Sequence, residues 1–202
     1  MNRLHDFYCR SGHWRSTLEQ LVSWAIAGVD LGAHVLELGP GQGLVMPLLR
    51  SRTTRVTAID KAPSAIRALG CQPGVGLVRG DATDLPFAAG TFSAVVAFTM
   101  LHHIPTKALQ QQLFREVFRI LQPGGVFVAV DPQFSFGLWL FHLGDTYASI
   151  PPDAAAFRLA SAGFRNIVVE RRPGFFRFCA HSSGAADVER TNPTKEPSGF
   201  RF

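Results

Sequence analysis

Residues 37–43 of this 202-residue chain read Glu-Leu-Gly-Pro-Gly-Gln-Gly, a composition that suits the binding of a nucleotide-like ligand. Glycines leave room for a ligand to approach the backbone, and a helix that follows would present its N-terminal amides. A tight turn between a strand and a helix would use the same residue types. The loop alone therefore leaves a binding loop and a structural turn as alternatives.

The spacing of the glycines disfavours a dinucleotide. The nicotinamide fingerprint, G-x-G-x-x-G, needs a third glycine at which the helix packs closely on the strand. Here Gly39 and Gly41 are followed by Gly43, and Leu44 stands where the third fingerprint glycine belongs. This spacing weakens a pyrophosphate-binding interpretation and makes a nicotinamide-dependent oxidoreductase a disfavoured alternative.

Two further acids follow apolar segments. Asp60 lies about 20 residues beyond the loop, where a carboxylate can accept both hydroxyls of a ribose or, alternatively, cap the next helix. Asp81 could accept a hydrogen bond from an exocyclic amine such as adenine N6, or lie in a solvated turn. Together with Glu37, these acids suit a ligand that carries an ammonium group, a ribose diol and an adenine but no phosphate. S-adenosylmethionine is such a ligand.

Two adjacent histidines, His102 and His103, follow a fourth apolar segment. A histidine on the ligand side could accept a proton near neutral pH, where its imidazole titrates. Residues 101–105, Leu-His-His-Ile-Pro, could equally form a structural turn. We take His103 as the candidate general base of the pair.

Alternating strands and helices would position these residues. The apolar segments are hydrophobic throughout, so each needs cover on both faces of a sheet, as βα units provide. A capping-box pattern at residues 16–19 predicts the start of an opening helix, which ends near residues 28–32. We expect parallel strands at residues 34–38, 55–59, 75–79, 93–98 and 126–130, and helices at residues 44–51, from Pro63, at 106–121 and at 153–162.

The last two expected strands, residues 166–170 and 175–180, are joined by only four residues. A parallel pair would need a crossover of about a dozen residues, so the joint predicts a hairpin and an antiparallel last strand. This asymmetry distinguishes the chain from an ordinary dinucleotide fold. Ligands of open α/β sheets bind beyond the carboxyl ends of the strands, where the loop, the acids and the histidines should meet.

Length and composition indicate one domain without a membrane anchor. With 202 residues, 47% of them apolar, the chain can bury one core. Its formal charge of +5 is scattered, so we attribute the charge to solubility, with an acidic or membrane-surface partner as a minor alternative. Residues 1–6 lack the apolar core of a signal peptide, and residues 134–143 are too few to span a bilayer.

The cysteines predict neither a disulfide framework nor a metal site. Cys9, Cys71 and Cys179 are odd in number, widely spaced and without a C-x-x-C pair. Reduced thiols in a cytoplasmic protein fit this pattern best. Residues 182–202 are rich in Ser, Gly, Thr, Pro and charges without periodicity, which predicts a mobile tail.

Five sequence segments occur in an order and spacing typical of one enzyme family. The segments VLELGPGQG, VTAID, GDATDLPF, FSAVVAFTMLHHI and LQPGGVFVAVD resemble the class I S-adenosylmethionine-dependent methyltransferases, in particular the ubiquinone and menaquinone methylase-like type 11 group. The resemblance implies a Rossmann-like, doubly wound seven-stranded sheet of order 3-2-1-4-5-7-6, mostly parallel with an antiparallel last strand. We expect a helical lid at residues 1–30, a methyltransferase domain at 31–181 and a mobile tail at 182–202.

The resemblance implies that one end of the site holds the methionine part of the donor. Glu37, Gly39 and Gly41 would contact it, and many members carry the shorter Asp in place of Glu37. Phe98 and Thr99 would lie beside it and open into the acceptor pocket.

The nucleoside end of the donor is assigned by the same resemblance. Asp60 would bind the ribose, Asp81 and Ala82 the adenine, and Lys61 would flank the adenine. The cofactor would be S-adenosyl-L-methionine, and the product S-adenosyl-L-homocysteine.

Residues 132–150 lie where this family commonly places acceptor-binding elements. They could form a core helix, or a pocket wall that favours an apolar or aromatic acceptor, with His142, Asp145 and Tyr147 as polar groups. Aromatic residues of the opening segment could form a second lid over the donor; they are Phe7, Tyr8, His13 and Trp14.

The expected function is methyl transfer from S-adenosylmethionine to a small, apolar or aromatic acceptor such as a lipid, quinone or secondary metabolite. The alternatives are a nucleic-acid or protein methylase and a donor-binding protein without catalysis. Residues 98–101, Phe-Thr-Met-Leu, lack the Asn-Pro-Pro-Tyr type of amide-methylating motif, so no nucleic-acid partner is expected. A small-molecule acceptor and a membrane-surface or lipid contact are the expected partners, and the sequence does not give the acceptor atom or the oligomeric state.

Overall fold

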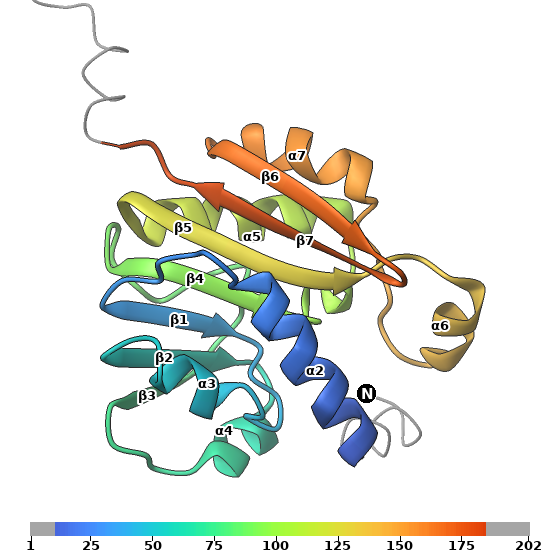
Figure 1. Ribbon diagram of the computed structural model, residues 1–202, viewed down its shortest axis with the longest axis horizontal. Coiled ribbons are helices and arrows are strands. Elements are labelled where there is room, and N and C mark those ends of the chain that lie inside the picture. The colour runs from blue at the N-terminus through green and yellow to red at the C-terminus, as the bar shows by residue number, and fades with distance from the viewer. Residues whose placement is uncertain (1–10, 185–202) are drawn as a thin grey trace, which may run out of the picture.

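The computed structural model describes residues 11–184 and contains a seven-stranded sheet in the order β3-β2-β1-β4-β5-β7-β6 (Figure 1). This order confirms the expected Rossmann-like fold. The strands are β1 (His34–Leu38), β2 (Arg55–Asp60), β3 (Val75–Arg79), β4 (Phe92–Phe98), β5 (Leu121–Pro132), β6 (Arg165–Arg172) and β7 (Phe175–His181). The helices are α2 (Gly12–Ala25), α3 (Met46–Arg50), α4 (Pro63–Leu69), the 3-10 turn η1 (Leu101–His103), α5 (Lys107–Ile120), α6 (Phe136–Phe141) and α7 (Pro152–Ala160).

The strand directions agree with the hairpin prediction. Strands β1 to β5 pair in parallel, whereas β7 runs antiparallel to both of its neighbours, β5 and β6. The connection between β6 and β7 is the dipeptide Pro173-Gly174, and Gly174 has a φ of 78°. A glycine adopts this left-handed conformation without strain, which permits the tight turn.

Two apolar cores lie on opposite faces of the sheet. Along β4, Ala94 and Val96 pack toward α2 and α3, whereas Val95 and Ala97 pack toward α5 and α7. Figure 1 shows α2 in front of the strands and α5 behind them. Because successive side chains of a strand point to opposite faces, a sheet covered on both sides needs strands that are apolar throughout.

The opening helix begins earlier than predicted. Helix α2 starts at Gly12, because the Ser11 hydroxyl accepts a hydrogen bond from the backbone N–H of Trp14 at 3.1 Å. The capping-box pattern at residues 16–19 is therefore a wrong start signal. The Thr17 hydroxyl instead donates to the carbonyl of His13 inside the helix, as exposed helical threonines do.

Other boundaries also differ: helix α2 ends at Ala25, three residues before the predicted end near residue 28. Helix α3 covers only five residues, so the glycine loop extends through Val45. Strand β5 begins at Leu121 instead of residue 126, because Leu121 pairs with Phe92 before the register shifts by a bulge. The remaining elements begin and end within two residues of the predicted positions.

The C-terminal end of the described chain is held by the sheet. The Ser182 N–H donates to the carbonyl of Gly125 at 2.8 Å, and its hydroxyl donates to the carbonyl of Gln122 at 2.6 Å. The expected tail therefore does not begin at Ser182, and its residues 185–202 lie outside the described residues. Phe7, Tyr8 and Cys9 also lie outside them, as does the rest of the expected lid before residue 11.

Two further features concern the described part of the chain. Within residues 11–184, no helix combines the length and apolar character that a bilayer crossing requires. Cys71 and Cys179 are free thiols.

Candidate functional site

A cavity of about 1550 Å³ opens beyond the carboxyl ends of the parallel strands. This is the edge at which ligands bind in open α/β sheets. The structure brings all of the sequence-predicted site residues to its wall: Glu37, Gly39, Gly41, Asp60, Lys61, Asp81, Ala82, Phe98, Thr99 and His103.

Glu37 is a buried carboxyl at the end of β1. One of its oxygens, Oε2, has no hydrogen-bond partner within residues 11–184. Burial, and to a smaller extent the neighbouring charge of Asp60, raises the pKa of Glu37 to about 8. A buried acid without a partner costs free energy unless a ligand supplies a donor or a positive charge. The site therefore fits a ligand with a cationic group at this position.

The glycine loop passes close to the end of β4. Gly39 has a φ of 65° and donates its N–H to the carbonyl of Ile59 at 2.9 Å. A Cβ atom at Gly39 would clash with Cγ of Met100, so a larger residue fits neither the conformation nor the space. Gly41 has a φ of 54° and open space where a Cβ would be. The loop is both a tight turn and a wall of the cavity.

Asp60 ends β2 and links the loop to the next helix. Its Oδ1 accepts the N–H of Ala62 at 2.8 Å, and its Oδ2 accepts the N–H of Gly41 at 3.4 Å. Ala62 is the N-cap residue of α4, so the helix-capping interpretation is correct in part. The carboxylate still lines the cavity, and within the described part of the chain its second oxygen makes only the long contact with Gly41.

Asp81 follows β3 and is held by three donors. Its Oδ1 accepts from the backbone N–H of Thr83 at 2.9 Å and from the Thr83 hydroxyl at 2.8 Å, and its Oδ2 accepts from Lys61 Nζ at 3.0 Å. The backbone hydrogen bond from Thr83 is the main cause of a lowered Asp81 pKa, with Lys61 contributing further. Asp81 is therefore ionised at neutral pH and can accept a further hydrogen bond from a ligand.

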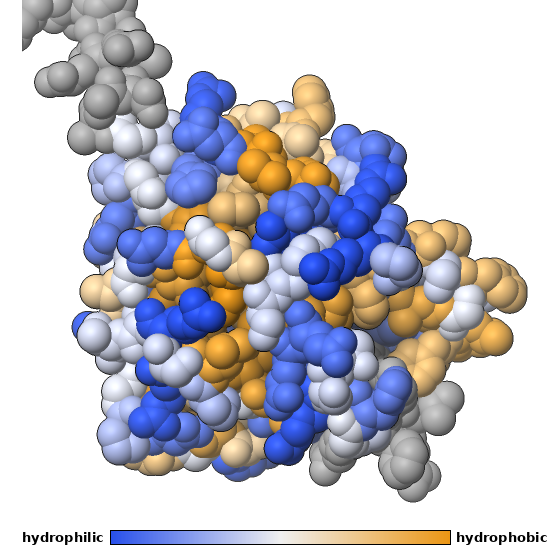
Figure 2. Space-filling view, viewed as in Figure 1, coloured by the Kyte–Doolittle hydropathy of each residue, from blue (hydrophilic) through white to orange (hydrophobic). Residues whose placement is uncertain are grey.

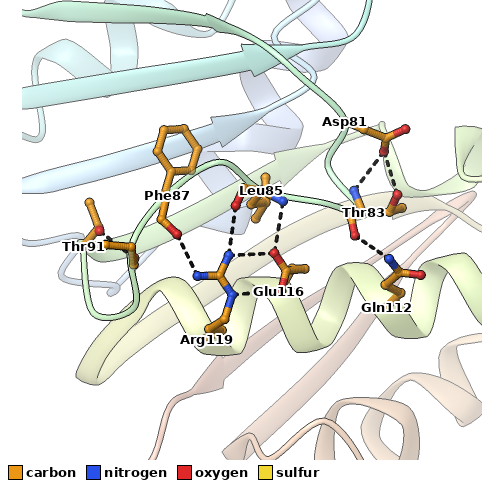
Figure 3. A network of polar contacts seen from close by, with 9 residues as sticks. Asp81, Thr83, Leu85, Phe87, Thr91, Gln112, Glu116 and Arg119 are labelled. Atoms are coloured by element: carbon orange, nitrogen blue, oxygen red, sulfur yellow. Dashed lines mark hydrogen bonds and ion pairs between the residues drawn. The ribbon is translucent and has the colours of Figure 1, made fainter.

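Helix α5 fixes the segment after Asp81, as Figure 3 shows. Gln112 donates to the carbonyl of Thr83 at 2.9 Å, and Glu116 accepts the N–H of Leu85 at 3.0 Å. Arg119 donates to the carbonyls of Leu85 and Phe87 at 2.9 and 2.7 Å, and it also pairs with Glu116. This network satisfies backbone groups of a segment that belongs to neither helix nor strand, and so it positions Asp81 at the cavity.

The chain turns sharply where β4 ends. Thr99 is one of two non-glycine residues with positive φ in the described chain, at 52°, and its N–H donates to the carbonyl of Val130 at 2.7 Å. Strain of this kind persists only where the surrounding structure imposes it, and it concentrates at functional sites. Phe98 and Thr99 both line the cavity next to the histidines.

His102 forms a buried pair with an acid that the sequence interpretation missed. The His102 Nδ1 lies 3.0 Å from Oδ1 of Asp131, and both side chains are almost completely buried. Asp131 stands near the end of β5, as Asp60 stands at the end of β2. The signal that could have found it is this position, an acid directly after the apolar residues 126–130.

His103 is half-buried and lies next to His102. Its Nδ1 lies 3.3 Å from the carbonyl oxygen of Thr146. Its backbone N–H donates to the carbonyl of Met100 within η1, so the expected structural turn is also present. The structural-turn interpretation of the Leu-His-His-Ile-Pro segment is therefore confirmed, and the role of His103 as a general base stays a prediction.

His142 completes a cluster of three histidines. It follows α6, and its Nδ1 donates to the carbonyl of Leu138 at 2.7 Å. Its ring centroid lies 5.3 Å from that of His102 and 4.8 Å from that of Tyr147. Burial lowers the pKa of His142 and raises that of Tyr147. Asp145, the third expected polar group, also lines the cavity.

Helix α6 projects from the end of the sheet beside the β6–β7 hairpin (Figure 1). None of its six residues is buried, so the core-helix interpretation of this segment is wrong. Phe136 is 70% exposed and Leu140 is 51% exposed, and Figure 2 shows the segment as an apolar projection. The inner side of the segment lines the cavity through Phe134, Leu138 and Phe141, and Trp14 of α2 lines it as well.

The sequence matches a known family model over residues 36–129, described as a methyltransferase domain. It is 33% identical to an uncharacterised methyltransferase of Synechocystis sp. over 67% of this chain and 68% of that protein. It is also 26% identical to 2-methyl-6-phytyl-1,4-hydroquinone methyltransferase 1 of Oryza sativa subsp. japonica, over 83% of this chain and 52% of that protein. The chain thus spans about half to two thirds of the lengths of these relatives.

Among solved structures, the complex of DhpI with SAH has a TM-score of 0.73 to this chain at 21% identity. The match covers 90% of this chain and 92% of DhpI. At this level of identity the likeness shows the shared fold.

Proposed function

The chain belongs to the class I S-adenosylmethionine-dependent methyltransferases, and we propose that it methylates a small, apolar or aromatic acceptor with S-adenosylmethionine as donor. The single observation that carries the donor assignment is the buried carboxyl of Glu37, whose Oε2 has no hydrogen-bond partner among residues 11–184 and which lines the same cavity as Asp60 and Asp81. Three acids at one cavity match an ammonium group, a ribose diol and an adenine.

The residues present fit the donor in chemical type. Glu37 would accept hydrogen bonds from the donor's ammonium group, and the missing side chains of Gly39 and Gly41 would let the methionine part approach the backbone. Asp60 would accept the ribose hydroxyls, because among residues 11–184 its Oδ2 makes only one long hydrogen bond. Asp81 would accept a hydrogen bond from the adenine amine, while Lys61 Nζ donates a hydrogen bond to Asp81 Oδ2.

The donor supplies a methyl group that its sulfonium already activates. The chain's own task is then to align the acceptor and to exclude water. Phe98 and Thr99 would lie between the donor-binding residues and the histidines. The fixed turn at Thr99 would keep the spacing between these two groups of residues constant.

The acceptor half of the cavity favours an apolar or aromatic molecule. Phe134, Leu138 and Phe141 provide an apolar wall, and the histidines with Asp145 provide polar groups. The similarity to a rice enzyme named for a phytyl hydroquinone supports this class of acceptor. Exposed apolar side chains on α6 support a contact with a lipid surface, from which such an acceptor could enter.

An acceptor that must lose a proton needs a base. We propose His103 for this role, because its imidazole ring lines the cavity that would hold donor and acceptor. We also propose a cytoplasmic location, in line with the free thiols of Cys71 and Cys179.

The test is turnover of donor labelled in the methyl group with a cell extract as the source of acceptors. The proposal predicts labelled product in the organic-solvent phase. Label in nucleic acid or protein would favour the alternative class of methylase. Binding of S-adenosylhomocysteine without transfer to any acceptor would favour a donor-binding protein that lacks catalysis.

A further inference from the structure

Two segments far apart in the sequence bring three histidines together at the acceptor end of the cavity. His102 and His103 follow β4, and His142 follows α6. One ring nitrogen of each lies within 4.8 Å of those of the other two, and all three side chains line the cavity. We propose that His102, His103 and His142 bind a divalent transition-metal ion of the zinc class.

The hydrogen bonds of the three Nδ1 atoms support this proposal. The three Nδ1 atoms face Asp131 Oδ1 at 3.0 Å, the carbonyl of Thr146 at 3.3 Å and the carbonyl of Leu138 at 2.7 Å. These partners are hydrogen-bond acceptors, so each Nδ1 carries the proton and each Nε2 carries the lone pair. Metal-binding histidines have this arrangement, in which the outer hydrogen bond fixes the tautomer and orients the ring.

Asp131 places a buried carboxyl group behind the cluster. Its side chain is 1% exposed, and its Oδ2 has no hydrogen-bond partner within residues 11–184. A buried carboxylate costs free energy unless a positive charge is near. A metal ion bound to His102 would supply that positive charge. The Asp131 carboxylate, the His102 imidazole and the metal would then form a carboxylate–histidine–metal triad, which is common at zinc sites.

The donor set selects the ion. Neutral imidazole suits zinc, cobalt and nickel, whereas magnesium and calcium prefer oxygen ligands. In a tetrahedral zinc site the ligand nitrogens are about 3.4 Å apart, so nitrogens that now lie within 4.8 Å of one another would approach by up to about 1.4 Å on binding. Three protein ligands leave a fourth position open toward the cavity, which is typical of a catalytic zinc site rather than a structural one.

The use of this ion rests on the proposed function. A hydroxyl of the acceptor would bind at the open position and release its proton to solvent, because the ion stabilises the oxygen anion. That oxygen would form the bond to the methyl carbon while the carbon–sulfur bond breaks and its electron pair stays on sulfur. In the metal-bound protein, the ion would replace His103 as the group that promotes loss of the proton.

Metal binding can be measured without donor or acceptor. The full chain is stripped with EDTA, and Zn²⁺ and Co²⁺ are then titrated by calorimetry and by visible absorption. We expect one ion per chain and an intense visible absorption spectrum, which is typical of Co²⁺ with a low coordination number. His103→Gln and His142→Gln should each weaken binding at least tenfold, and Asp131→Asn should weaken it about 10- to 100-fold.

The matched control is His34→Gln, because His34 is also half-buried but lies at the start of β1, away from the cavity. Its affinity for Zn²⁺ should equal that of the unchanged chain. The proposal is overturned if Co²⁺ keeps its pale aqueous spectrum, or if the cluster variants bind as the control does. If a variant does not fold, as circular dichroism would show, the Co²⁺ spectrum of the unchanged chain still decides.

The same titrations separate this proposal from the proposed function. S-adenosylhomocysteine that binds the metal-stripped chain while Co²⁺ does not would refute the metal site alone. Co²⁺ bound by the three histidines in a chain that does not bind S-adenosylhomocysteine would refute the methyl-donor assignment and leave the metal site standing.

Discussion

The carboxyl groups of Glu37 and Asp60 line one cavity, and the charge of Asp60 adds to burial in raising the pKa of Glu37 to about 8. The ligand-free chain therefore holds a proton on Glu37 at neutral pH. A cationic ligand group beside Glu37 would stabilise the ionised carboxylate and so favour loss of that proton. This relationship links the stability of the chain to its binding of donor.

Replacement of Glu37 by Gln should remove the pH dependence of stability that this carboxyl group causes. The pKa of Glu37 is raised in the folded chain, so the native state binds more protons than the unfolded state between about pH 4.5 and 8. The stability of the unchanged chain should fall as pH rises through that window. Glu37→Gln should then be more stable at pH 8, by at least about 1.4 kcal/mol, and similar at pH 5. Urea unfolding at both pH values measures the free energy of unfolding of each protein. The expectation is refuted if the variant and the unchanged chain differ by the same amount at pH 5 and at pH 8.

Asp60→Ala should weaken binding of S-adenosylhomocysteine at least tenfold, about 1.4 kcal/mol, by loss of a charge-assisted hydrogen bond. The variant also loses the bond to the N–H of Ala62. Asp30→Ala is a matched control, because Asp30 accepts the N–H of Gly32 two residues on at 2.9 Å but lies outside the cavity. Calorimetry should show unchanged affinity for the control. Equal affinity of Asp60→Ala and the unchanged chain would remove the ribose assignment.

Arg119→Met should destabilise the fold near Asp81. The carbonyls of Leu85 and Phe87 would lose their donor, and Glu116 would lose its partner. Since the Arg119 side chain is 38% exposed, we expect a loss of about 1 kcal/mol in the free energy of unfolding. Arg115→Met, an exposed site on the same helix, should cost less than half of this in urea unfolding. A loss no larger than that of the control would show that the network contributes little.

The double variant Phe136→Ser/Leu140→Ser should bind anionic lipid vesicles less than the unchanged chain does. Both side chains are exposed on α6, and their apolar area would enter the lipid surface. Affinity for S-adenosylhomocysteine should not change. Phe157→Ser is the control, because Phe157 is 77% exposed on α7 and away from the cavity. Vesicle sedimentation measures the difference, and equal loss in both variants would argue against α6 as the contact.

The sequence was sufficient for the parts of the site that depend on local pattern. The glycine loop and the acids Asp60 and Asp81 follow apolar strands directly, so the end of each strand places them at one edge. The start of α2 was missed because a capping-box pattern also occurs inside the helix, while Ser11 provides the actual cap. The early start of β5 depends on pairing of Leu121 with Phe92, which no local pattern reveals.

The acceptor half of the site could be predicted only in part. His102 and His103 are adjacent in the sequence, but His142 reaches them only because the chain after α6 returns to η1, where the N–H of Ala148 donates to the carbonyl of His102. Asp131 pairs with His102 across 29 positions of the chain. Such contacts depend on tertiary packing, and hydrophobic periodicity carries no information on them.

The most direct test of the methyl-donor assignment is calorimetry of S-adenosylhomocysteine at pH 7 in two buffers of different ionisation enthalpy. The account predicts binding with release of a proton, because Glu37 must ionise to pair with the ligand's ammonium group. Glu37→Gln should bind more weakly and release none. NADH bound more tightly than S-adenosylhomocysteine, or S-adenosylhomocysteine bound with no dependence on the buffer, would contradict the account.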